Sequence, residues 1–136
     1  MRAVLDPNVL IAALLSPRGT PAALIVRWLA GDFELVVSEH LLGELSRALA
    51  YPKIRARITD EDATAFVEHV RVNADMAIDP SKPRARSVDS NDDYLLALAE
   101  AEHALLVSGD KHLLDLADAF PIRTPREFAD TLKSGR

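Results

Sequence analysis

The sequence contains no cysteine among its 136 residues, which excludes disulfides and thiolate metal sites. It also contains no apolar run near the length of about 20 residues that is needed to cross a bilayer. The apolar run at residues 9–15 is preceded closely by Asp6 and Pro7, and we interpret it as a helix after a strand and not as a secretion signal. These absences favour a cytoplasmic protein that does not act in a membrane.

An excess of basic residues is also missing. The 16 Lys and Arg residues are outnumbered by 21 Asp and Glu residues, and the formal net charge is −5. This balance argues against a protein that holds nucleic acid by charge attraction over a broad surface. A site for a polyanion would instead depend on clustered acids, because divalent ions bound to them invert the local charge.

Short apolar runs alternate with amphipathic segments, without an internal repeat or a long linker. We therefore predict a single domain over residues 1–136 with an α/β fold, in which a parallel sheet has helices on both faces. Ser38, Thr59 and Thr124 are predicted helix N-caps, and Gly31 a helix end. The longest loop is expected at residues 79–91. The expected strands are 3–5, 35–37, 105–107, 121–123 and a weaker 76–78, and the expected helices are 8–15, 21–31, 39–50, 60–73, 92–103, 110–118 and 125–133.

Two aspartates follow predicted strands closely. Asp6 comes directly after the first strand, and Asp110 is separated from the strand at 105–107 only by Ser108 and Gly109. Sites in parallel α/β folds lie at the carboxyl ends of the strands, so both positions favour function. The alternative for Asp6 is a structural role as the N-cap of the helix that begins at Pro7.

Glu44 lies within a hydrophobic stripe. In the helix after Ser38, Leu41, Glu44, Leu45 and Ala48 share one face. Burial of a lone carboxylate is costly, so this glutamate either points into an enclosed polar site or lies at the edge of the stripe. Both interpretations remain open when Glu44 is considered alone.

Asp92 heads a comparable stripe with Leu95, Leu96 and Ala99. The same spacing places Asp110 above a stripe in the following helix. Acids in a first helical turn are common because they complement the helix dipole, but the dipole does not account for the inward face. Asp93 is one position further round the helix and is expected on the rim.

Four carboxylates at one edge of a sheet could not all remain ionised without a cation, because like charges raise one another's pKa. Carboxylate oxygens completed by water suit Mg²⁺ or Mn²⁺. Zinc is disfavoured because the histidines show no paired ligand spacing. The histidines are His40, His69, His103 and His112.

Four motifs, in this order and spacing, resemble those of the PIN-domain nucleases, and especially of the VapC-like toxins of toxin–antitoxin pairs. The motifs are LDPNVLIA from Leu5, residues 37–45 from Val-Ser to Glu-Leu, DDYLLALAE from Asp92, and LVSGD ending at Asp110. The resemblance covers nearly the whole chain. It implies a three-layer α/β/α sandwich around a parallel sheet of four to five strands, and endonucleolytic cleavage of RNA with Mg²⁺ or Mn²⁺. It also implies a cognate antitoxin and a homodimer.

The resemblance assigns the four family acids to Asp6, Glu44, Asp92 and Asp110, as catalytic residues and metal ligands. Asp93 could exchange with Asp92 as a ligand, although the stripe favours Asp92. Pro7 departs from the family, which usually has threonine or serine there, and a hydroxyl that could orient a water is missing. Predicted supporting groups are Asn8 and Ser108, and candidate phosphate contacts are Arg18, Lys53, Arg55, Arg57, Lys111 and His112.

Two other functions fit parts of the sequence. An inert PIN-like module that binds protein is kept open by Pro7, although all four acids are present. A Mg²⁺-dependent phosphotransfer domain would need two acids close after the first strand, and Asp6-Pro7-Asn8 supplies only one.

Overall fold

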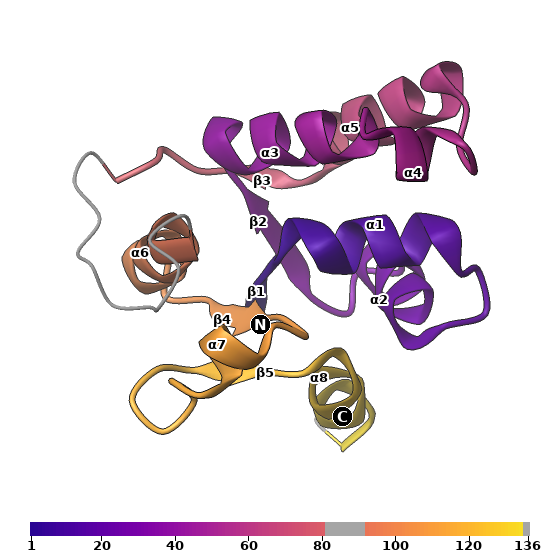
Figure 1. Cartoon of the computed structure of the whole chain (residues 1–136). Helices are drawn as coiled ribbons and strands as arrows, with labels where there is room; N and C mark the ends of the chain where they lie inside the picture. Colours follow the sequence, from indigo (N-terminus) through magenta and orange to yellow (C-terminus); the bar gives the residue numbers. More distant parts are fainter. Residues whose placement is uncertain (81–91, 135–136) are drawn as a thin grey trace.

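The computed structural model describes residues 1–80 and 92–134. They form a five-stranded sheet in the order β3-β2-β1-β4-β5, in which every pairing is parallel. Helix α6 lies on one side of the sheet, and α1 and α2 lie on the other (Figure 1). The predicted parallel α/β sandwich is therefore confirmed. The strands are β1 (Arg2–Leu5), β2 (Glu34–Val37), β3 (Asp75–Met76), β4 (Leu105–Val107) and β5 (Ile122–Arg123).

The predicted N-caps are confirmed. Ser38 accepts a hydrogen bond from the Leu41 amide, Thr59 accepts one from the Asp62 amide, and Thr124 and Glu127 form a reciprocal capping box. Gly31, with φ of +85°, follows the end of α2. The helices are α1 (Pro7–Leu15), α2 (Thr20–Leu29), α3 (Glu39–Leu49), α4 (Pro52–Arg55), α5 (Asp60–Asn73), α6 (Asp93–Ala101), α7 (Lys111–Leu114) and α8 (Pro125–Ser134).

Some details differ from the prediction or fall outside the described residues. Helix α4 was not expected. Helix α7 ends at Leu114 and not at residue 118, because the amides of Leu116 and Ala117 bond to carbonyls three residues back and so form turns. The loop predicted at 79–91 lies mostly outside the described residues.

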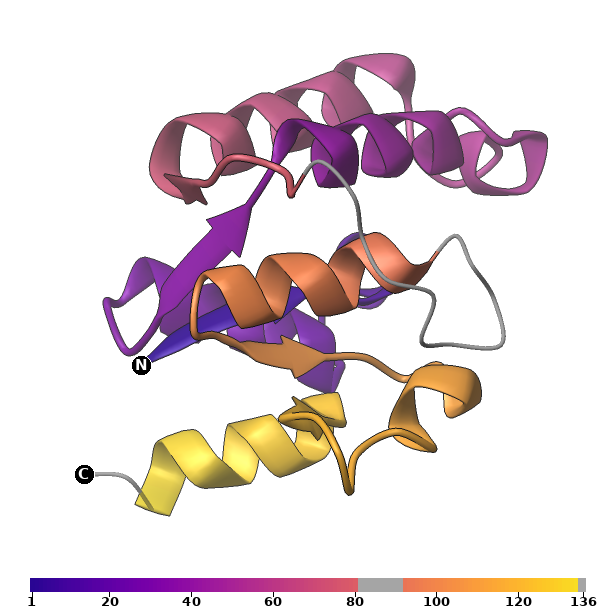
Figure 2. The ribbon, with the colours of Figure 1, turned by 90° about the vertical axis from the view of Figure 1, so that its left-hand side faces the viewer.

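The register of the central strands positions the site. Leu5 of β1 is paired with Val107 of β4, and the Asp6 amide donates to the Val107 carbonyl at 3.0 Å. Asp6 and Ser108 therefore leave the sheet side by side at its carboxyl edge. At the opposite edge, Arg2 forms ion pairs at 3.0 Å with Asp75 and at 2.9 Å with Glu102. These pairs join β1 to β3 and to the end of α6, which lies in front of β1 and runs alongside β4 in Figure 2.

No single helix in the described part of the chain is long and apolar enough to cross a membrane. Only α1 and α2 taken together pass on length and composition, and the two helices are bent by 100° relative to each other.

Candidate active site

Asp6 is the N-cap of α1 and is only 4% exposed. One carboxylate oxygen accepts a hydrogen bond from the Asn8 amide at 3.0 Å, and the other accepts one from the Ser108 hydroxyl at 2.7 Å. Pro7 occupies the first helical position, where no amide hydrogen is needed. The N-cap role predicted as an alternative is therefore confirmed, and it does not remove Asp6 from the site.

The electrostatic environment of Asp6 is unfavourable for its negative charge. Burial is the main cause that raises its pKa, and the charges of Asp110 and Glu44 add to it. The hydrogen bonds from Asn8 and Ser108 act in the opposite direction but do not cancel the effect. A cation near Asp6 would stabilise its negative charge.

Glu44 of α3 is anchored by an aromatic pair that the sequence analysis missed. The buried Tyr94 of α6 donates its hydroxyl to one carboxylate oxygen at 3.0 Å. The Nε2 atom of His40 lies 3.7 Å from the other oxygen, and its ring stacks on that of Tyr94 with centroids 3.9 Å apart. Burial and the charge of Glu44 raise the pKa of Tyr94, so the phenol stays a hydrogen-bond donor.

Asp92 faces the same space as Asp6 and Glu44. The three acids line a cavity of about 250 Å³ together with Arg47 and Tyr51. Asp93, which was expected on the rim, is instead buried at 5% exposure. The rim prediction is wrong because α6 buries six of its nine residues, so that more than one face is covered. The stripe rule assumes a single buried face.

Asp110 lies in an adjoining cavity. Its carboxylate caps α7 by accepting from the His112 amide at 2.8 Å, and its own amide donates to the Ser108 hydroxyl oxygen at 3.0 Å. Asn8 lines both cavities. The four predicted acids are thus divided between two cavities that share Asn8.

The acids fit a hydrated divalent ion better than a fully protein-coordinated one. Within residues 1–80 and 92–134, no three acidic or histidine side chains are close enough to hold one ion jointly. Each of Asp6, Asp110 and Glu44 is instead stabilised by hydrogen bonds from its own surroundings. Mg²⁺ retains several waters and commonly binds one or two carboxylates directly, so this donor set suits it.

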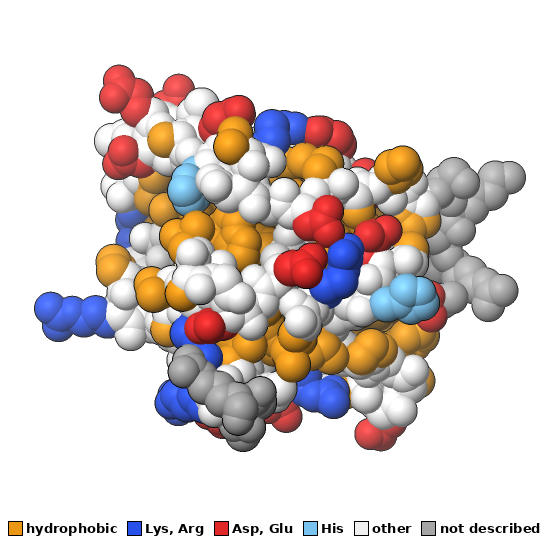
Figure 3. All heavy atoms as spheres, turned by 180° about the vertical axis from the view of Figure 1, so that it is seen from behind, with side chains coloured by type: hydrophobic (Ala, Val, Ile, Leu, Met, Phe, Trp, Pro, Cys, Tyr) orange, Lys and Arg blue, Asp and Glu red, His pale blue; other side chains and the backbone are white. Residues whose placement is uncertain are grey.

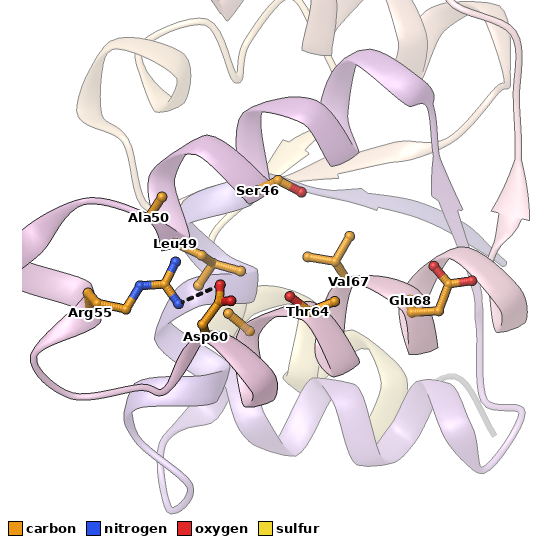
Figure 4. Close-up of a pocket in the computed structure, with 9 residues that line it drawn as sticks. Ser46, Leu49, Ala50, Arg55, Asp60, Thr64, Val67 and Glu68 are labelled. Carbon is orange, nitrogen blue, oxygen red and sulfur yellow. Dashed lines mark ion pairs between the residues drawn. The ribbon is translucent and has the colours of Figure 1, made fainter.

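The basic residues are not arranged as the sequence suggested. Arg47, which lies one turn after Glu44 on α3, lines the acidic cavity. The sequence analysis did not name it, although its i+3 spacing from Glu44 indicates that the two side chains are neighbours on the helix. Arg55 lines a separate cavity against α5 and pairs there with Asp60 at 3.1 Å (Figure 4). Arg57 donates to the Leu15 carbonyl at 3.1 Å. On the face shown in Figure 3, Lys and Arg are scattered among other side chains and form no continuous patch.

The fold and these residues define a parallel α/β protein with an acidic site at the carboxyl edge of its sheet. The sequence matches the PIN domain family over residues 2–112, and the chain belongs to that family, whose members are generally nucleases. The family predicted from the motifs is therefore confirmed.

The chain is also similar to one curated protein and shares its fold with solved structures. Uncharacterized protein MJ1680 from Methanocaldococcus jannaschii is 24% identical over 140 residues, which cover 96% of this chain and 90% of that protein. The structure of PAE2754 from Pyrobaculum aerophilum has a TM-score of 0.68 at 17% identity and covers 98% of this chain and 96% of its own. A chain of VapBC2 from Rickettsia felis, in a crystal structure with a DNA fragment from the VapBC2 promoter, has a TM-score of 0.65 at 15% identity. The match covers 91% of this chain and 98% of that chain.

Proposed function

We propose that this protein is a Mg²⁺- or Mn²⁺-dependent endoribonuclease and the toxin of a toxin–antitoxin pair. The observation that carries the proposal is the placement of Asp6 at the carboxyl edge of the sheet, where it is buried among Glu44, Asp92 and Asp110. A buried carboxylate whose pKa is raised by burial and by neighbouring acids, as for Asp6, is costly for folding and is typical of a functional site.

In the proposed reaction, Asp6, Asp92 and Asp110 would hold one or two hydrated divalent ions, each bound directly by one or two carboxylates and otherwise by water. When bound, the ion neutralises charge on the phosphate and lowers the pKa of nearby water. Glu44 orients the attacking water through the oxygen that Tyr94 leaves available. The water oxygen forms a bond to phosphorus, one ester P–O bond breaks, and the leaving oxygen takes up a proton. Arg47, which lines the cavity, would contact a phosphate oxygen of the substrate.

The replacement of a hydroxyl residue by Pro7 is compatible with activity. Asp6 is held by the Ser108 hydroxyl and the Asn8 amide without a hydroxyl at position 7, although the group that could orient a water there is still missing.

The proposed partner is an antitoxin protein, by analogy with VapBC2. Helix α2 exposes Val26 at 65% and Leu29 at 53%, apolar side chains that a bound partner or a second copy of the chain would cover.

An RNA cleavage assay tests the function. Purified protein with Mn²⁺ should cut single-stranded RNA, and excess EDTA should stop the reaction. Asp92→Asn should reduce the rate by about 100-fold or more, because each metal ligand supports several kcal/mol of transition-state stabilisation. If wild type and variant were equally active, the cleavage would come from a contaminant. If neither were active, the binding-module alternative would be favoured.

Removing the Tyr94 hydroxyl tests how Glu44 is positioned. Tyr94→Phe should weaken Mn²⁺ binding and slow cleavage, each by about tenfold, as expected when a group that orients a ligand is lost. Isothermal titration with Mn²⁺ measures the first effect without reference to activity. Thr131→Val, which removes a hydroxyl bonded to the Glu127 carbonyl on α8, is the matched control and should leave both quantities unchanged. An unaltered Mn²⁺ affinity in Tyr94→Phe would show that the hydroxyl only supports the fold.

A further inference from the structure

A second cavity adjoins the acidic one. It has a volume of about 420 Å³, within the range of about 300–1,000 Å³ typical of small-ligand sites. It lies at the same carboxyl edge, between α1, α2, the loop after β4 and the first residue of α8. Its walls are mainly apolar, from Val9, Ala12, Pro21 and Pro125, and its polar side chains are Asn8 and Asp110.

We propose that this cavity binds the base of the nucleotide next to the scissile phosphate of a single-stranded RNA. The inference rests on the proposed nuclease function and adds a substrate subsite to it. A nucleobase has apolar faces and a hydrogen-bonding edge, and proteins recognise unpaired RNA bases by covering the faces and bonding to the edge. The two proline rings, Val9 and Ala12 can cover the faces, and the Asn8 amide, which both donates and accepts, can bond to the edge.

Continuity with the acids places this base beside the reaction. Asn8 lines both cavities. An RNA strand whose scissile phosphate lies at the acids would therefore pass across Asn8 into the second cavity. Ser108 strengthens the link, because it donates to Asp6 at 2.7 Å and accepts from the Asp110 amide at 3.0 Å. The buried Ser108 side chain thus bonds to one residue of each cavity, Asp6 and Asp110.

The charge of the cavity favours a neutral group. Among the described residues that line it, the only charged side chain is Asp110, and no Lys or Arg side chain lines it that would attract a phosphate or an acidic peptide. The space is also open at Gly109, where an added Cβ atom would meet nothing within 4 Å. A nucleobase attached to the bound RNA strand is uncharged and flat, so it satisfies both conditions.

A double-mutant cycle between protein and RNA tests the proposal. The substrates are a short RNA of mapped cleavage site and a series in which single riboses near that site lack their base, and kcat and KM are measured with Mn²⁺. In wild type, one abasic position should raise KM by about fivefold, near the lower end of what one stacked base contributes, with kcat little changed. Ala12→Leu, which fills the cavity, should raise KM similarly on intact RNA, and the abasic position should then have no further effect.

Ala23→Leu is the matched control, since Ala23 lines a different cavity between α2 and α8, and its KM should equal that of wild type. If the abasic position and Ala12→Leu acted independently, or if no abasic position raised the wild-type KM, the cavity would not be a base subsite. The abasic series in wild type decides this even if Ala12→Leu folds poorly. Absence of any cleavage by wild type would instead overturn the nuclease function itself, and the subsite with it.

Discussion

Replacing Asp6 with asparagine should remove nearly all RNA cleavage and, at the same time, stabilise the metal-free protein. The loss of activity should be about 100-fold or more, because the most buried carboxylate of the acidic site would no longer attract the ion. The free energy of unfolding of the metal-free protein should rise, because the ionised Asp6 carboxylate destabilises the folded state. Few substitutions of a buried group are expected to combine these two effects.

The sign follows from the pKa of Asp6, which burial and the neighbouring acids raise above its ordinary value of 3.8. A carboxyl whose folded pKa is raised contributes stability below the unfolded pKa, and this stability is lost as pH rises through the folded value. At neutral pH the folded protein therefore carries an unfavourable charge. Asparagine removes the charge and remains a good N-cap, since its carbonyl oxygen can accept from the Asn8 amide.

Thermal unfolding in EDTA at pH 7 and near pH 4, with a parallel cleavage assay, measures both effects. Asp6→Asn should melt at a higher temperature than wild type at pH 7, and the difference should shrink near pH 4. Millimolar Mn²⁺ should raise the midpoint of wild type but raise that of the variant less. Asp118→Asn, which removes an exposed carboxylate, is the control and should match wild type in cleavage. A lower midpoint for Asp6→Asn at pH 7 would mean that the charge of Asp6 stabilises the metal-free fold.

Phe128→Ala should have the largest effect on stability. Phe128 of α8 is completely buried and packs edge-to-face on Phe33, with ring centroids 4.9 Å apart. Truncation of a buried phenylalanine costs about 3–5 kcal/mol, a large part of the roughly 5–15 kcal/mol that stabilises a domain. Because α8 also places Pro125 at the second cavity, the variant should impair RNA binding as well.

Urea unfolding followed by circular dichroism measures this cost. Val26→Ala, at a site that is 65% exposed, is the control and should change the free energy of unfolding by no more than about 0.5 kcal/mol. A loss below about 1 kcal/mol for Phe128→Ala would show that the space left by the ring is readily refilled, contrary to a tightly packed core.

The positions of the helices and strands were predictable because their signals are local. Caps such as Ser38 and Thr59 act within three residues, and short apolar runs identify strands that are covered on both faces. The exceptions depend on neighbours outside the segment. Asp93 is buried because α6 is covered on more than one face, which a one-face helical pattern does not anticipate.

The candidate site was predictable in part for the same reason. Asp6 and Asp110 follow strands, and the carboxyl ends of parallel strands share an edge whatever the details of packing. Arg47 and Tyr94 were missed because neither carries a carboxylate. The spacing of Arg47 from Glu44 on α3 was a signal in the sequence, whereas the position of Tyr94 beside Glu44 becomes visible only once α3 and α6 are placed against the sheet.

The sequence by itself determined the parallel α/β fold, the PIN family and the set of acids from which a metal site could be built, because periodicity, capping and motif spacing are properties of short segments. Tertiary structure alone decided how those acids are divided and supported. The hydroxyl of Ser108 reaches Asp6 across 102 positions of the chain, and that of Tyr94 reaches Glu44 across 50. Contacts of this range depend on strand register and helix packing, and they place the acids around two joined cavities and not one.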